Sequence, residues 1–171
     1  ATPTRDIDPL LMNAISPTSL HRHAFPAVGG EIELLLDTQV APPPAIWAQI
    51  EQLVFHLEDR LSRFSPESSL SRLNQFGSVH GEHELAEVVS LALAARERTQ
   101  GLFDPTVHEA LVRWGYDRSF ADLRPNDQPA PGSRPCGGPV EVDLTAGTVR
   151  VASGVRLDLG GIAKGFIVDR A

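Results

Sequence analysis

The most informative stretch of the sequence is Leu157-Asp158-Leu159-Gly160-Gly161-Ile162-Ala163-Lys164-Gly165-Phe166. Alternating apolar residues up to Leu159 predict a strand, and the two glycines followed by apolar residues predict a turn that opens a helix. Such a turn exposes backbone N–H groups at the positive end of the helix dipole, which favours a phosphate or pyrophosphate, and Lys164 adds a positive charge. A tight turn with a solvated lysine is the alternative, because the stretch matches neither the P-loop nor the G-x-G-x-x-G pattern.

The residues just upstream of this stretch predict a β-meander. Apolar and polar residues alternate over 140–144, 149–151 and 155–159, and short glycine-containing segments separate the three. The last strand of the meander is expected to lead into the glycine-rich turn. The helix after the turn ends with the chain, so we expect residues 166–168 to need a partner surface and the meander to need further strands.

Two long amphipathic helices are predicted earlier in the chain. The first covers residues 46–64, where apolar residues recur every three or four positions after a proline run, and the second covers 84–99 and ends before a glycine. A third helix is predicted to begin with Asp104 as its N-cap and Pro105 in its first turn. Residues 31–36 alternate as a strand with one face on a core. Together these patterns predict an α+β fold, with mixed or antiparallel sheets and packed helices.

The composition limits the classes of function. The 171 residues, 42% of them hydrophobic, suit one domain, within which 117–139 is interpreted as a long surface connection. A formal net charge of −7 without a Lys/Arg cluster argues against nucleic acid as a partner. No uninterrupted apolar stretch approaches the roughly 20 residues that span a bilayer. The single cysteine, Cys136, is interpreted as a spare loop thiol, and no catalytic triad or carboxylate dyad is recognisable.

Two other segments carry candidate ligand contacts. Phe64 follows Arg63 at the end of the first helix and precedes several serines, so it is placed to stack on a planar ring; a core aromatic before an exposed turn is the alternative. Phe103 and Asp104 stand where a loop meets a helix. They border a ligand in one interpretation, and in the other they are a core residue and a helix cap.

Three motifs in order resemble the ApbE family of FAD:protein FMN transferases. They are Ser62-Arg63-Phe64 with Ser68 and Leu70-Ser71-Arg72-Leu73-Asn74, then Gly101-Leu102-Phe103-Asp104-Pro105-Thr106-Val107 with Trp114-Gly115, and finally Asp158-Leu159-Gly160-Gly161-Ile162-Ala163-Lys164-Gly165. The resemblance runs from residue 23 to residue 171, which leaves 1–22 as an N-terminal extension and 23–171 as the N-terminal portion of a single ApbE-like domain.

The resemblance implies an α+β domain that binds FAD and uses Mg²⁺ to move FMN to a threonine hydroxyl of a target protein, with release of AMP. It assigns contacts with FAD to Val28, Phe64, Leu102, Phe103, Asp104, Asp158 and Lys164. The carbonyl of Gly161 would be a ligand of Mg²⁺, an ion that prefers oxygen ligands. No catalytic residue is assigned. The partners implied are FAD and a threonine-bearing protein.

Three departures from the family pattern stand out. Val28-Gly29-Gly30 replaces Met-Gly-Thr, Ser69 replaces an acidic residue, and His108 replaces a glycine. The family's aspartate and threonine that bind Mg²⁺ through side chains are expected beyond residue 171. A flavin-binding protein without transfer activity and an FAD pyrophosphatase that releases FMN and AMP therefore stay open as alternatives.

The compartment is predicted from the same sequence. No export signal follows Met12, which favours the cytoplasm. Because members of the family occur on both sides of the inner membrane, the periplasmic face of that membrane is the alternative.

Overall fold

The computed structural model describes residues 19–116 and 136–171. Most of the surface connection expected at 117–139, and most of the N-terminal extension, lie outside the described residues. The described part has the predicted α+β class, with antiparallel sheets and packed helices. No helix among the described residues combines the length and apolar character needed to cross a membrane.

The described part of the chain opens with an antiparallel hairpin of β1 (Ser19–Ala27) and β2 (Gly30–Thr38). The connection is the two-residue turn Val28-Gly29, with φ of 50° and 73°. Positive φ at both central residues is the requirement of a type I′ turn, whose twist suits a hairpin. The predicted alternation of β2 is confirmed, because Ile32 and Leu34 pack against the core while their neighbours are exposed.

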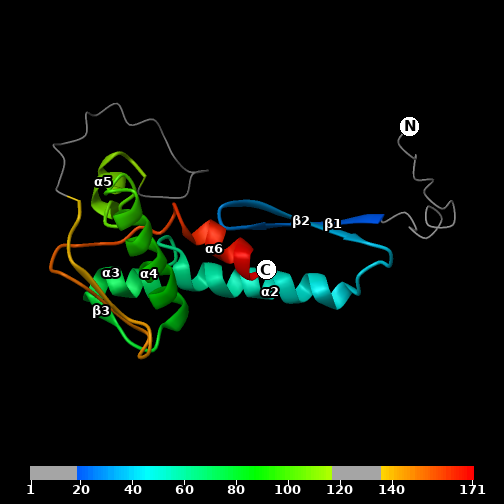
Figure 1. The fold of residues 1–171 in the computed structure, drawn as a ribbon, viewed down its shortest axis with the longest axis horizontal. Helices are drawn as coiled ribbons and strands as arrows, with labels where there is room; N and C mark the ends of the chain where they lie inside the picture. Colours follow the sequence, from blue (N-terminus) through cyan, green and yellow to red (C-terminus); the bar gives the residue numbers. More distant parts are fainter. Residues whose placement is uncertain (1–18, 117–135) are drawn as a thin grey trace, which may run out of the picture.

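Helix α2 (Pro44–Leu61) confirms the first amphipathic helix, with a proline in its first turn as expected. It runs alongside the hairpin, and α6 (Ala163–Arg170) lies beside it (Figure 1). Val54, Leu57 and Leu61 form the buried face of α2. The end of this helix is therefore fixed between the hairpin and the C-terminal part of the chain.

Two helices follow. Ser68 caps α3 (Ser69–Phe76) by accepting a hydrogen bond of 2.9 Å from the Ser71 N–H, and Gly77 ends it in the left-handed conformation. Helix α4 (His83–Arg98) confirms the second long helix, and the structure buries four of the residues predicted for its apolar face: Leu85, Val88, Val89 and Ala92.

The second sheet has the order β3-β5-β4, formed by β3 (Ser78–Val79), β4 (Val140–Asp143) and β5 (Thr148–Val151). The prediction of a third meander strand at 155–159 was wrong. This segment pairs with no strand among residues 19–116 and 136–171. The Asn74 side chain instead donates to the carbonyl of Leu157 (2.8 Å) and accepts from its N–H (2.7 Å). The Asn74 amide thus makes the two hydrogen bonds that a neighbouring strand would make with Leu157. The strand that pairs with β5 on the side away from β4 is β3.

The third predicted helix begins later than expected. Helix α5 (His108–Arg113) starts after Val107, whereas the Asp104 carboxylate accepts from the N–H (2.9 Å) and hydroxyl (2.7 Å) of Thr106. Asp104 therefore closes a local turn before the helix and is not its N-cap.

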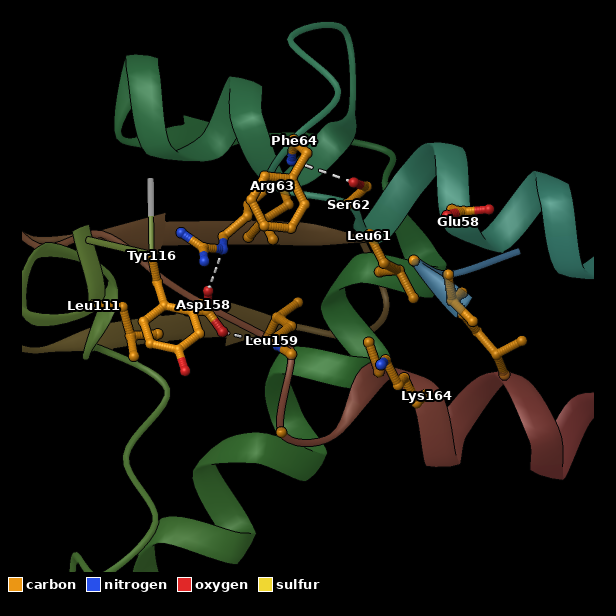
Figure 2. Close-up of a pocket in the computed structure, with 17 residues that line it drawn as sticks. Glu58, Leu61, Ser62, Arg63, Phe64, Leu111, Tyr116, Asp158, Leu159 and Lys164 are labelled. Atoms are coloured by element: carbon orange, nitrogen blue, oxygen red, sulfur yellow. Dashed lines mark hydrogen bonds and ion pairs between the residues drawn. The ribbon is translucent and has the colours of Figure 1, made fainter. Parts of the chain in front are cut away.

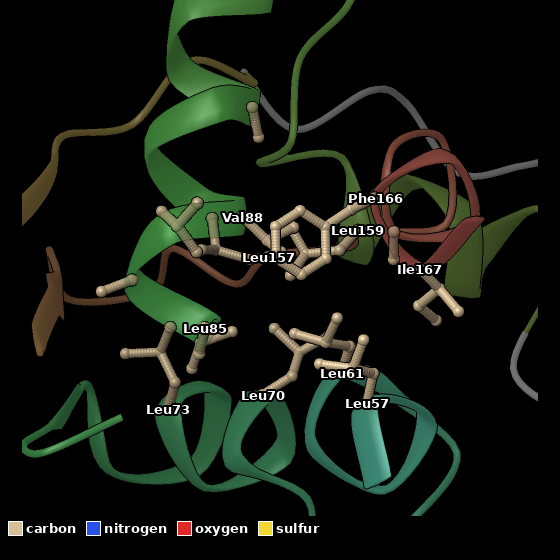
Figure 3. Close-up of a cluster of buried hydrophobic side chains, with 14 of the residues drawn as sticks. Leu57, Leu61, Leu70, Leu73, Leu85, Val88, Leu157, Leu159, Phe166 and Ile167 are labelled. Atoms are coloured by element: carbon tan, nitrogen blue, oxygen red, sulfur yellow. The ribbon is translucent and has the colours of Figure 1, made fainter. Parts of the chain in front are cut away.

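The main core lies where α2, α3, α4 and α6 surround the 157–159 segment. Figure 3 shows leucines of the first three helices meeting Leu157, Leu159, Phe166 and Ile167. Phe166 and Ile167 are buried in this core, so the expectation that they need a further partner surface is not met for these two residues, while Val168 is 65% exposed. Because Leu157 and Leu159 are fully buried on either side of Asp158, the core fixes the backbone that leads into the glycine-rich turn.

Candidate functional site

A cavity of about 430 Å³ opens where the hairpin turn, the end of α2 and the glycine-rich turn meet. Figure 2 shows Arg63 next to Phe64, with Tyr116 to their lower left and Lys164 to their lower right. Five of the eight residues assigned by the resemblance line the cavity: Val28, Phe64, Asp158, Gly161 and Lys164. Segments from positions 28 to 167 therefore converge on one hollow.

The other three assigned residues are not among those lining the cavity. Phe103 lies behind the turn, since a Cβ built on Gly161 would come within 2.9 Å of the Phe103 Cε2 atom. Asp104 is held by Thr106 and by Arg96, whose Nε lies 3.5 Å from a carboxylate oxygen of Asp104. The Leu102 side chain is 94% exposed. These residues thus support the turn from outside or face solvent.

The glycine-rich turn exposes its backbone to the cavity. Gly160 and Gly161 are exposed, and the Gly160 N–H donates to the Asp158 carboxylate at 2.9 Å. Phe103 explains the need for glycine at 161, because any side chain there would strike the aromatic ring. Helix α6 begins two residues later. The N–H groups of Ile162 and Ala163 already donate to the Leu159 carbonyl at 2.9 and 2.8 Å, so this helix end offers an anion mainly the positive end of its dipole.

Lys164 is an available cation at this helix end. It is exposed, lines the cavity, and forms no ion pair with any residue in the described part of the chain. A free ammonium beside a helix N-terminus and a glycine turn is an arrangement suited to an anion.

Arg63 is a cavity residue that the sequence reasoning missed as a site residue. Its Nε lies 2.7 Å from Oδ2 of Asp158, and the two side chains are only 11% and 8% exposed. Its guanidinium also lies 4.4 Å from the centroid of the Phe64 ring. The available signal was a basic residue beside the motif aromatic, but its partner is far away in the sequence.

The aromatic side chains at this cavity are partly open to solvent. Phe64 is 49% exposed, so it is not the core aromatic that was considered as an alternative. Tyr116 also lines the cavity and is 43% exposed; sequence reasoning did not select it. Exposed rings at a cavity mouth are able to stack on a planar ligand.

The serines near Phe64 are used in the fold. Ser68 caps α3, and the Ser69 hydroxyl donates to the Glu82 carboxylate at 2.6 Å. Glu82 also pairs with Arg60 and Arg72. Burial raises the pKa of Glu82, but the Ser69 hydrogen bond and the arginine charges lower it overall. The departure at position 69 therefore lies outside the cavity, where an acidic residue would repel Glu82.

The departure at position 108 places an imidazole close to the Arg63–Asp158 pair. Burial, followed by the charge of Arg63, lowers the pKa of His108 below its ordinary value of 6.5. Its buried Nδ1 has no hydrogen-bond partner in the described residues and lies 3.7 Å from a Glu109 carboxylate oxygen. His108 is therefore a neutral side chain at physiological pH.

Comparison with known proteins gives consistent results. The model of the ApbE family matches residues 28–171. Two curated relatives are each named FAD:protein FMN transferase: one from Vibrio cholerae, 26% identical over 143 residues, and one from Haemophilus influenzae, 28% identical over 135 residues. The alignments cover 81% and 71% of this chain but 43% and 38% of the relatives, so the chain spans about two fifths of their length.

Solved structures agree with the sequence comparisons. The ApbE protein of Thermotoga maritima superposes with a TM-score of 0.71 at 26% identity, covering 89% of this chain and 51% of the other. The flavinyl transferase ApbE of Pseudomonas stutzeri has the same fold, with a TM-score of 0.70 at 18% identity and coverages of 90% and 52%.

Proposed function

The chain belongs to the ApbE family, whose model matches residues 28–171, and from that premise we propose that the protein moves FMN from FAD to a threonine hydroxyl of a target protein and releases AMP. The observation that supports this most strongly is the convergence of the glycine-rich turn, Lys164 and Phe64 on one cavity. Its volume of about 430 Å³ is within the range of small-molecule sites.

The phosphate-binding end of the site is formed by the glycine-rich turn. The pyrophosphate of FAD lies against Gly160 and Gly161, where the absence of side chains lets the backbone approach an anion. Lys164 and the N-terminus of α6 neutralise its charge. Positioning and charge neutralisation are the main contributions that a protein makes to transfer of a phosphoryl group.

The flavin-binding end is formed by the hairpin turn and the end of α2. The Phe64 ring is exposed on the cavity wall and supported from one side by Arg63, so it offers a flat surface to the isoalloxazine ring. Val28 adds an apolar contact from the hairpin turn. The site thereby distinguishes a planar flavin from a free pyrophosphate.

The reaction itself joins two partners and releases one. The threonine oxygen attacks the phosphorus of the FMN half, a new phosphoester bond forms, and the bond from that phosphorus to the bridging oxygen breaks. The electron pair of that bond leaves with AMP, and the hydroxyl proton is released to solvent. The described residues hold the substrate in place for this displacement.

Bound Mg²⁺ would neutralise charge on the phosphoryl oxygens, and the resemblance assigns it the Gly161 carbonyl. In residues 19–116 and 136–171, no three His, Cys, Asp or Glu side chains are grouped to hold a metal ion. Asp158 is already paired with Arg63. The described residues thus do not make a complete Mg²⁺ site, and the roles given above rest on the protein's own groups.

The test of this proposal is a transfer assay. The protein is incubated with FAD, Mg²⁺ and a threonine-bearing candidate acceptor, and the acceptor is followed by mass spectrometry while AMP is measured by chromatography. We expect the acceptor to gain the mass of an FMN phosphoester and AMP to appear in equal amount. The same acceptor with its threonine replaced by valine is the control and stays unmodified.

Two results would replace the proposal with another function. An unmodified acceptor together with free FMN and AMP would identify an FAD pyrophosphatase. Saturable binding of FAD without any cleavage would identify a flavin-binding protein.

A further inference from the structure

Arg63 is a charged residue that lines the cavity. The proposed function gives it one role, which is to support the Phe64 ring. It follows the end of α2, and its Nε lies 2.7 Å from the Asp158 carboxylate. Both side chains are about nine-tenths buried. A buried carboxylate is costly unless it is paired and hydrogen-bonded, so removal of the Arg63 side chain would leave the Asp158 carboxylate without its ion-pair partner.

Asp158 connects the Arg63 ion pair to the glycine-rich turn. Its second carboxylate oxygen accepts the Gly160 N–H at 2.9 Å, and its own N–H donates to the Pro105 carbonyl at 2.8 Å. The Arg63 side chain therefore connects the end of α2 to the first residue of the turn through a single carboxylate.

Arg63 also acts on the other end of the cavity. The guanidinium lies over the Phe64 ring at 4.4 Å from its centroid. Phe64 is half exposed, so few contacts with the core hold it in place. A cation at this distance attracts the face of the ring and fixes its orientation.

We infer that Arg63 is a positioning residue, which holds Asp158 and the glycine-rich turn at one end of the cavity and Phe64 at the other, in the arrangement that binds FAD. The inference rests on the proposed function, because the ligand it names is the FAD of that proposal. Arg63 acts through Asp158 and Phe64; it is not assigned a step in the reaction.

The chain provides a matched control in Arg60. This residue lies one turn earlier on α2, and its Nη1 lies 2.6 Å from the carboxylate of Glu82, whose side chain is 10% exposed. That pair belongs to a different hollow, which Asp59, Ser65 and Arg72 also line. Arg60→Gln thus removes an ion pair to a buried carboxylate without touching the FAD cavity.

The experiment measures FAD affinity by quenching of flavin fluorescence in the wild-type protein and in Arg63→Gln, Arg63→Lys, Asp158→Asn, Arg63→Gln/Asp158→Asn and Arg60→Gln. We expect Arg63→Gln to weaken FAD binding by about tenfold or more, and Arg63→Lys, which keeps the charge, to recover part of the loss. Arg60→Gln is expected to leave the affinity unchanged.

The double variant separates positioning from direct contact. If Arg63 acts through Asp158, the losses of FAD affinity caused by the two substitutions are not additive. The affinity of the double variant is then about equal to that of the single variant that binds FAD more weakly. Additive losses would show that Arg63 acts on the ligand independently, and they would overturn the inference. Equal affinities in Arg63→Gln and Arg60→Gln would overturn it as well.

A measurement without FAD separates this inference from the proposed function. Hydrogen exchange of the Gly160 amide is measured by NMR in the ligand-free protein. We expect exchange to be faster than in the wild-type protein in both Arg63 variants, with a larger increase in Arg63→Gln than in Arg63→Lys. Exchange in Arg60→Gln should be unchanged. Unchanged exchange in the Arg63 variants would refute the positioning role. A wild-type protein that shows no FAD binding would refute the proposed function, while the exchange data still test whether Arg63 orders the turn.

Discussion

Val28 combines a strained backbone with a place at the cavity. Its φ of 50° lies in the left-handed region, which β-branched residues rarely occupy, and its side chain lines the cavity. Backbone strain at a residue that lines a cavity is better explained by a functional role than by a contribution to stability. We predict that Val28→Asn raises the free energy of unfolding by about 1 kcal/mol, because asparagine suits a type I′ turn, and that it weakens FAD binding.

Urea denaturation and FAD titration of the same variant check this prediction. Gly29→Ala serves as the control: no atom lies within 4 Å of the added Cβ, but φ is +73°, so it should destabilise by about 1–2 kcal/mol through backbone strain alone. A less stable Val28→Asn variant would show that the turn does not store strain at this residue.

His108 should make the stability depend on pH. Burial lowers its pKa in the folded protein, so the unfolded chain binds a proton first as the pH falls through the ordinary value of 6.5. More protons on the unfolded state mean that stability decreases from about pH 7.5 to about pH 5.5. His108→Leu removes this proton and a buried Nδ1 that lacks a hydrogen bond in the described residues, so the variant should lose less stability over that range.

The comparison of the two proteins by urea denaturation at both pH values tests this expectation. All other groups are the same in the two proteins, so their contributions to the pH dependence cancel in the difference. Parallel losses of stability in the wild-type protein and in His108→Leu would contradict the assignment to His108.

At the residue scale, the sequence could identify some of the site residues that sit in motifs. Phe64 and Lys164 stand in local patterns that suggest a ligand contact, whereas Val28 and Asp158 were assigned through the family resemblance; the structure brings all four to one cavity. Arg63 stands in the first motif and Tyr116 directly follows the second, but neither was selected, because its place in a motif does not show that its side chain reaches the cavity. The partner of Arg63 is Asp158, and an ion pair between residues so far apart depends on how the helices pack, which no local pattern contains.

The glycine-rich turn is the element whose shape the proposed site requires most. A Cβ on Gly161 would lie 2.9 Å from Phe103, whereas one on Gly165 in α6 meets nothing within 4 Å. We predict that Gly161→Ala weakens FAD binding by about tenfold or more, because the turn must shift. Gly165→Ala is the matched control, and it should leave FAD affinity unchanged while stabilising the helix by about 1 kcal/mol.

A second variant tests the cause of the effect. Phe103→Leu combined with Gly161→Ala removes the clash and should recover part of the FAD affinity in the same titration. Equal losses of affinity in Gly161→Ala with and without Phe103→Leu would show that the aromatic ring does not impose glycine at this position.

At the element scale, the long helices were predictable because apolar residues at helical spacing bury one face, as α2 and α4 do. The 155–159 segment has the alternation of a strand but pairs with none of the described strands. Its backbone is held by the Asn74 amide and by the Pro105 carbonyl, which are contacts from distant parts of the chain. Alternation reports that one face is buried, and it does not identify the hydrogen-bond partner.

At the scale of the whole molecule, the core and the cavity share a wall. Leu61, Leu70, Leu159 and Ile167 belong to the buried cluster and also line the cavity. The α+β class could be predicted from the order of helices and strands, whereas the convergence of the hairpin turn, the end of α2 and the glycine-rich turn depends on tertiary packing. The order of the three family motifs was the signal that anticipated it.

Equilibrium titration of the protein with FAD tests the central claim most directly, with Lys164→Gln as the cavity variant and Arg170→Gln as its control. Arg170 lies on the same helix, but its ion pair with Glu87 is exposed and away from the cavity. We predict saturable binding of one FAD per chain, weakened about tenfold in Lys164→Gln and unchanged in Arg170→Gln. Absence of saturable binding, or equal affinity in all three proteins, would contradict the assignment of this cavity to FAD.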